Sequence, residues 1–342
     1  ASGWYPQIND MLVAGTDLTN LRVFLGLSGP GNGGPQVLGA IKIFDGNTGT
    51  ELPNSIILGD FMTFGVRDIA LCSDYRHPLS SSNPYSVAVA YSIGNAGGVD
   101  SLNYLFSDDG LNFTGPYTID TATNGTYLSL DIAYGSYQNP AVGKFGVSFI
   151  KGDNLGVVFT DPGSPTTFSG YSLIDTMNIY TSGQCANPVI SMQSSDIANS
   201  SSDYTTVILA EVVNPSNSSN DLVSFNLNDT QNGGIWNMQV IDSSTLYTVT
   251  PALLYDETFS NFIATYYDAT TKELPLLYED LNFSGNWMRT SSDYPDTFQF
   301  TTPTPCLTTI PGQNSIACSW KQLSDSSILP GPHQSLKLDH ML

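Results

Sequence analysis

The chain repeats one pattern of short apolar runs at a nearly regular interval. Each repeat starts with a small polar residue that is followed at once by apolar residues, and the six starts are Asp10, Asp68, Asp131, Asn187, Thr250 and Thr304. Successive starts are 58, 63, 56, 63 and 54 residues apart. Such a period through a whole chain predicts a repeat fold in which every repeat is one supersecondary unit.

Each repeat continues with further apolar runs in the same order. In the repeat that starts at Asp68, these runs cover 85–92, 102–108 and 113–120, and they are rich in β-branched and aromatic residues. Four short antiparallel strands per repeat are typical of a β-propeller blade, which buries its two faces against neighbouring blades. We therefore predict an all-β propeller of six four-stranded blades in a single domain over 1–342, with five or seven blades also compatible.

The composition limits the partners that such a domain can take. Hydrophobic residues make up 40% of the chain, enough to bury a core, whereas only 12% of residues are charged. The net charge of −21 comes from 31 acidic and 10 basic residues, so the surface repels phosphate backbones and anionic lipid. Nucleic acid and membrane insertion are therefore not expected.

Several features indicate a secreted chain. No apolar run reaches the about 20 residues of a membrane helix, and Ala1 opens no signal peptide, as in a mature secreted protein. Sequons for N-glycosylation begin at Asn112, Asn124, Asn199, Asn217, Asn228 and Asn282. We expect an extracellular glycoprotein.

The four cysteines fit an oxidising compartment. Cys306 and Cys318 flank a Pro-Gly turn between two apolar runs, which predicts a disulfide bond across a hairpin. Cys72 and Cys185 are far apart in sequence, and the spacing leaves open whether they pair with each other, pair between chains or stay reduced.

The stretch LFSDDGLNFTG at 105–115 carries a recognisable turn motif. Ser107, Asp109 or its neighbour Asp108, Gly110 and Phe113 supply the residue types of the Asp-box, which joins the third and fourth strands of a blade. Weaker echoes occur at 159–170 and 276–285. The chain thus resembles sialidase-like and furanosidase-type propellers. Since Asp and Ser cap backbone N–H groups and Gly takes a positive φ, the turn itself is structural.

The resemblance to sialidases implies a catalytic site that this chain does not supply. Such a site would need three arginines around the substrate carboxylate, but the chain has four arginines in all, and only Arg67 stands at a repeat start. Histidine gives no alternative, because His77, His333 and His340 lack any zinc-binding spacing. We expect no sialidase site.

The repeat starts are the remaining candidates for a site, because they would line one mouth of the propeller channel. Asp10, Asp68, Asp131 and Asn187 could cap backbone N–H groups, form a ring that binds a ligand or Ca²⁺, or supply glycosidase carboxylates. Furanosidase-type propellers place acidic residues at such starts, which makes Asp68 and Asp131, with Arg67 beside them, the candidate catalytic residues. No cofactor other than Ca²⁺ is indicated.

Two functions follow from these observations. The main hypothesis is a non-catalytic propeller that binds glycans or extracellular proteins, copies of itself included, or that serves as a structural subunit of an extracellular assembly. Trp236 and Trp287, at equivalent fourth-strand positions, would pack between blades or form sugar pockets. The alternative is a glycoside hydrolase with acidic residues at the channel mouth.

Overall fold

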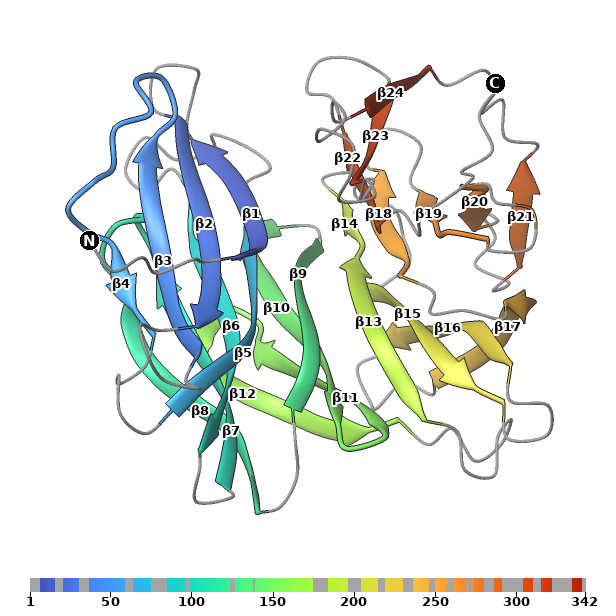
Figure 1. Ribbon diagram of the computed structural model, residues 1–342, viewed down its shortest axis with the longest axis horizontal. Helices are drawn as coiled ribbons and strands as arrows, with labels where there is room; N and C mark the ends of the chain where they lie inside the picture. The colour runs from blue at the N-terminus through green and yellow to red at the C-terminus, as the bar shows by residue number, and fades with distance from the viewer. Residues whose placement is uncertain are drawn as a thin grey trace. The chain divides into compact units, whose positions relative to one another are not determined.

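The protein is described by a computed structural model (Figure 1). The described residues are 7–15, 21–30, 37–58, 64–74, 85–95, 99–123, 127–137, 139–174, 184–195, 204–214, 219–229, 236–245, 250–256, 261–268, 271, 274–279, 286–290, 304–309, 315–321 and 334–339. The chain divides into two compact units, 1–174 and 175–342.

Unit 1 contains three antiparallel sheets whose strands follow one another in sequence order. The first is built from β1 (Gln7–Gly15), β2 (Leu21–Pro30), β3 (Val37–Asp45) and β4 (Ile56–Ile57). The second is built from β5 (Phe64–Ser73), β6 (Val87–Asn95), β7 (Val99–Ser107) and β8 (Thr114–Thr123). The third is built from β9 (Tyr127–Tyr137), β10 (Asn139–Lys151), β11 (Asn154–Asp161) and β12 (Ser164–Leu173).

Unit 2 repeats this arrangement (Figure 1, yellow to red). One sheet consists of β13 (Cys185–Met192), β15 (Tyr204–Val213), β16 (Asn220–Asp229) and β17 (Trp236–Thr245), with the two-residue strand β14 (Ser194–Ser195) between β13 and β15 in sequence. The next consists of β18 (Ala252–Asp256), β19 (Asn261–Thr265), β20 (Leu276–Glu279) and β21 (Trp287–Thr290). The last described sheet has β22 (Thr304–Thr309), β23 (Ser315–Lys321) and β24 (Gln334–Asp339).

The predicted all-β class and the four-strand order of the repeat are therefore confirmed. Each of the six repeat starts lies in the first strand of its own sheet or, for Thr250, two residues before it. The described part of the chain contains no helix, and so no helix that could span a membrane.

The alternating pattern of β6 explains how one sheet packs on two neighbours. Val87, Val89 and Tyr91 belong to a core cluster shared with the first sheet, whereas Ala88 and Ala90 face a cluster shared with the third sheet. Successive strand residues point to opposite faces, so the sequence VAVAY places bulky side chains on one face of the strand and small side chains on the other. The small face leaves room for large side chains from the third sheet.

Aromatic rings of the third sheet fill that room. Phe149 on β10 is fully buried, and its ring meets that of Tyr127 edge-to-face with centroids 5.8 Å apart. Gly156 stands opposite Phe149 in the register, and a Cβ atom there would come within 2.4 Å of the phenylalanine ring. A similar cluster in unit 2 lies between the β13 and β18 sheets and includes Trp287, as expected for packing between blades.

The predicted disulfide bond between Cys306 and Cys318 stays a prediction, because the side chain of Cys318 lies outside the described part of the structure and only its strand register is described. In the β22–β23 pair, Cys306 stands opposite Ser319, and Cys318 stands opposite Leu307. Because successive residues alternate between the faces of a sheet, this pairing is one residue out of step with a bond between the two cysteines. The Sγ atom of Cys306 lies 4.0 Å from the carbonyl oxygen of Leu307.

Candidate functional site

The first strands of unit 1 place two acidic repeat starts on adjacent strands. Strands β1 and β5 lie beside each other, and each has a β-bulge directly before its aspartate, between Ile8 and Asp10 and between Val66 and Asp68. The strands begin earlier than predicted, so these aspartates lie within the strands rather than at their ends. A bulge re-aims the following side chain, and such irregularities often border functional sites.

Both carboxylates are anchored by backbone N–H groups, including groups of the next sheet. Asp10 accepts hydrogen bonds from its neighbour Met11 and from Leu71 on β5, each at 2.7 Å. Asp68 accepts hydrogen bonds from its neighbour Ile69 and from Leu130 on β9, each at 3.0 Å. The capping interpretation therefore accounts for their contacts, with the addition that each cap joins two sheets.

Both aspartates hold their protons more tightly than usual. Burial raises the pKa of Asp10 to about 6, the hydrogen bonds from Leu71 and Met11 oppose this shift, and the charge of Asp68 adds to it. Burial also raises the pKa of Asp68, against the opposing hydrogen bonds from Leu130, Asn9 and Ile69. Neither side chain is sealed from solvent, since both keep part of their surface exposed. Raised carboxyl pKa values at accessible positions are typical of general acids.

The other predicted ring members lie in different settings. Asp131 stands on β9, beside β5, and accepts a hydrogen bond of 2.8 Å from Ile132. Asn187 belongs to unit 2, where it has a positive φ of 48° and donates to buried Glu211 at 3.0 Å. Thr250 precedes β18 and Thr304 begins β22 in the same unit.

The predicted Ca²⁺ ring stays a prediction, and the hydrogen-bond donors around these oxygens bear on it. Both carboxylate oxygens of Asp10 and of Asp68 already accept N–H hydrogen bonds, one of them from the amide of Asn9 at 3.2 Å. Among the described residues, no group of three or more His, Cys, Asp or Glu could hold a metal ion. The histidines lie outside the described ranges.

Arg67 reaches across its own sheet. Its guanidinium lies against Gly94 on β6 and pairs with Asp100 on β7 at 3.2 Å. Arg22 lies at the opposite strand end, where it donates to the carbonyl oxygen of Asp109 at 2.8 Å, and Arg289 of unit 2 pairs with Asp268 at 3.2 Å. Within the described residues no three arginines converge, so no sialidase clamp forms there.

The turn at 105–115 is structural, as predicted. Asp109 accepts hydrogen bonds from Ser107 at 2.9 Å and from the backbone N–H groups of Leu111 and Asn112 at 2.7 Å. Partial burial opposes ionisation, yet these hydrogen bonds hold the pKa of Asp109 at about 2. Gly110 has a φ of 66°. The turn follows the end of β7, whereas Asp68 lies within β5.

A second polar contact between sheets was not predicted from the sequence. Asp120 on β8 accepts hydrogen bonds from the Tyr127 hydroxyl at 2.5 Å and from Lys151 Nζ at 2.7 Å, both in the next sheet. In unit 2, Asp242 on β17 accepts a hydrogen bond from the hydroxyl group of Tyr266 in the next sheet. Both aspartates follow an isoleucine, so the repeated Ile-Asp dipeptide was the available signal.

Tyr127→Phe is expected to lower the free energy of unfolding by about 1.5 kcal/mol, because it removes a hydrogen bond to a charged group between two sheets. Urea unfolding would measure the change. Tyr104→Phe is the matched control, because its fully buried hydroxyl has no hydrogen-bond partner in the described part of the chain. Equal effects of the two substitutions would contradict a stabilising role for the contact.

Comparison with known proteins identifies relatives by structure alone. No protein-family model matches the sequence, and no curated protein matches it. The structure is similar to an α-L-arabinanase from Penicillium chrysogenum complexed with arabinobiose, at 13% identity and a TM-score of 0.54, over 98% of both chains. It is also similar to an α-L-arabinofuranosidase from Fusarium graminearum with an iminosugar inhibitor, at 11% identity and a TM-score of 0.51, over 92% of this chain and 93% of the enzyme.

A Hadza microbial sialidase is similar at 13% identity and a TM-score of 0.51, over 91% of this chain. The alignment spans 62% of the sialidase's own length. Together these structures confirm the predicted resemblance to sialidase-like and furanosidase-type propellers. At these identities the likeness extends to the fold.

The comparisons correct the main functional hypothesis. A non-catalytic binding or structural module was expected, and so was the absence of enzyme activity. The three solved structures named above are glycoside-cleaving enzymes, which contradicts both expectations and favours the alternative. The hypothesis was wrong because it treated the three arginines of a sialidase site as a requirement for catalysis. A glycosidase needs only a pair of suitably placed carboxyl groups.

Proposed function

We propose that the protein is a glycoside hydrolase whose catalytic carboxyl groups are Asp10 and Asp68. The observation that carries the proposal is the pair itself: two partly accessible aspartates on adjacent first strands, both with pKa values raised mainly by burial, with the charge of Asp68 adding to the shift of Asp10. The shared fold of arabinan- and sialoside-cleaving enzymes supports it.

The two aspartates can divide the work of glycoside cleavage. Asp10, with a pKa of about 6, keeps its proton in mildly acidic solution and can donate it to the leaving oxygen as a general acid. Asp68 supplies the second, ionised carboxylate that the oxocarbenium-like transition state requires. The anchoring N–H groups of Leu71 and Leu130 hold both carboxyl groups in fixed orientations. Asp131, on the next first strand, is a third candidate.

A panel of aryl glycosides that includes furanosides and pyranosides tests the activity. Wild-type protein is expected to hydrolyse at least one member, and Asp68→Asn is expected to abolish this turnover because it removes the ionised carboxylate. Asp108→Asn is the matched control, since it makes the same chemical change at an exposed turn position at the other strand end. Turnover that survives Asp68→Asn, or that Asp108→Asn also removes, would overturn the assignment.

We further propose that the six sheets are six blades of one secreted, N-glycosylated domain that acts on glycans. The presence of each repeat start in or just before its own first strand supports the blade number. The sequons support an extracellular location. Small-angle X-ray scattering of the secreted protein would test the single domain, since two separately mobile units would give a larger radius of gyration.

A further inference from the structure

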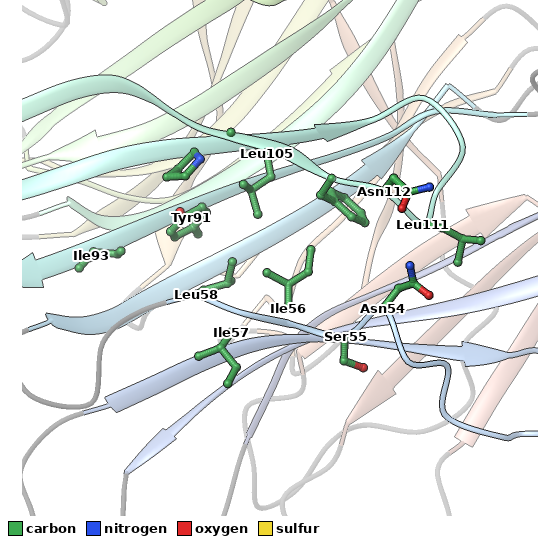
Figure 2. A pocket seen from close by; sticks show the side chains of 13 residues that line it. Asn54, Ser55, Ile56, Ile57, Leu58, Tyr91, Ile93, Leu105, Leu111 and Asn112 are labelled. Atoms are coloured by element: carbon green, nitrogen blue, oxygen red, sulfur yellow. The ribbon is translucent and has the colours of Figure 1, made fainter.

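A groove lies between the first and second sheets of unit 1, away from the aspartate pair (Figure 2). It has a volume of about 510 Å³, within the range of pockets that hold small ligands. One wall is the segment Ile56–Leu58 around β4, and β6 contributes Tyr91 and Ile93. Ile57 in this wall remains 64% exposed, which is unusual for a large aliphatic side chain beside a buried core.

The opposite wall carries the glycosylation sequon Asn112-Phe113-Thr114. Asn112 is exposed, and its Nδ2 atom donates a hydrogen bond of 2.6 Å to Oδ2 of Asp109. A carboxamide nitrogen carries two hydrogens, so one can be replaced by a sugar while the other keeps this bond. Asp109 thus fixes the plane of the Asn112 amide, and with it the direction in which an attached glycan would extend.

The groove has polar groups at one end and apolar groups at the other, which matches the polar substituents and the apolar C–H face of a sugar. Figure 2 shows Asn54 and Ser55 at the same end of the groove as Asn112, whereas Tyr91 and Ile93 lie at the other end. The polar pair can hydrogen-bond acetamido and hydroxyl groups, and the apolar residues can pack against the C–H face of a pyranose ring. Asn112 is also the one sequon whose side chain falls within the described residues.

We propose that Asn112 is N-glycosylated and that the first two sugars of its glycan occupy this groove and cover Ile57. The group transfer needs a polyprenyl-diphosphate oligosaccharide as donor. A bond forms between Nδ2 and C1 of the first sugar, the bond from C1 to the diphosphate oxygen breaks with its electrons on the diphosphate, and Nδ2 releases one proton. This inference rests on the proposed N-glycosylation of the secreted protein and is independent of the proposed hydrolase activity.

The test uses the full chain secreted from a yeast that attaches high-mannose glycans. Mass spectrometry of the proteolytic peptide around Asn112 measures occupancy, and endoglycosidase H, which cuts between the first two sugars, measures their accessibility. We expect an occupied site whose native cleavage is about tenfold slower than after denaturation, which corresponds to about 1.4 kcal/mol of protection.

Two matched variants separate groove packing from general protection. Ile57→Asp places a charge on the groove wall and is expected to restore fast native cleavage at Asn112. Ile8→Asp makes the same change at a similarly exposed isoleucine, 61% against 64%, outside the groove, and should leave cleavage slow. An unglycosylated Asn112, or equally fast native cleavage in wild type and Ile57→Asp, would overturn the proposal.

Discussion

Replacing Phe149 by alanine is expected to lower the free energy of unfolding by about 3–5 kcal/mol. The ring is fully buried between the second and third sheets, against the small face that Ala88 and Ala90 provide. Truncation would remove the contact with Tyr127 and leave a cavity, because a strand fixed on both sides by its ladder cannot collapse into it. Urea unfolding followed by circular dichroism measures the loss.

Gly156 supplies the control that ties the effect to the geometry. Gly156→Ala alone is expected to destabilise the protein, since the new Cβ atom would come within 2.4 Å of the Phe149 ring. In the Phe149→Ala background the ring is absent, and the same alanine should be tolerated. A double-mutant cycle would reveal this coupling. Equal costs of Gly156→Ala in both backgrounds would contradict the packing described here.

The repeat and its strands were predictable because each strand has a recognisable pattern of side-chain types in its own sequence. The run 85–92 alternates between bulky and small residues, and this period identifies a strand buried on both faces without any knowledge of its neighbours. The turn at Asp109 was predictable for the same reason, since its hydrogen-bond partners lie within three residues. Features whose stabilising contacts lie within a few residues of one another can be predicted from the local sequence.

Features that depend on how two segments align could not be predicted in this way. The register of the β22–β23 hairpin is one example, because a shift of one residue moves a side chain to the other face and the hairpin sequence does not specify which residues stand opposite each other. The partner of Asp10 is the N–H group of Leu71, 61 residues away, on another sheet. The sequence marked Asp10 and Asp68 as equivalent, yet their bulges, the burial of both carboxyl groups and the effect of the Asp68 charge on Asp10 appear only once the sheets are adjacent.

Asp10→Asn is expected to lower the turnover of a glycoside with a poor leaving group by about 10²–10⁴-fold, the usual contribution of a general acid. The acid works only while protonated, so wild-type activity should fall as the pH rises through about 6, the pKa of Asp10. Asp68 must be ionised, and burial raises its pKa above 3.8, so activity should also fall on the acidic side. The pH–rate profile is therefore a bell with its optimum below pH 6, and Asp10→Asn should lose the alkaline limb.

The leaving group distinguishes this role from a structural one. A dinitrophenyl glycoside departs without protonation, so Asp10→Asn should retain most of its activity on that substrate, whereas Asp68→Asn should lose activity on both. A misfolded active site would impair both substrates alike in the Asp10→Asn variant. Because the assignment of Asp10 as the acid rests on its pKa of about 6, equal sensitivity of the two variants to the leaving group would remove the basis for that assignment.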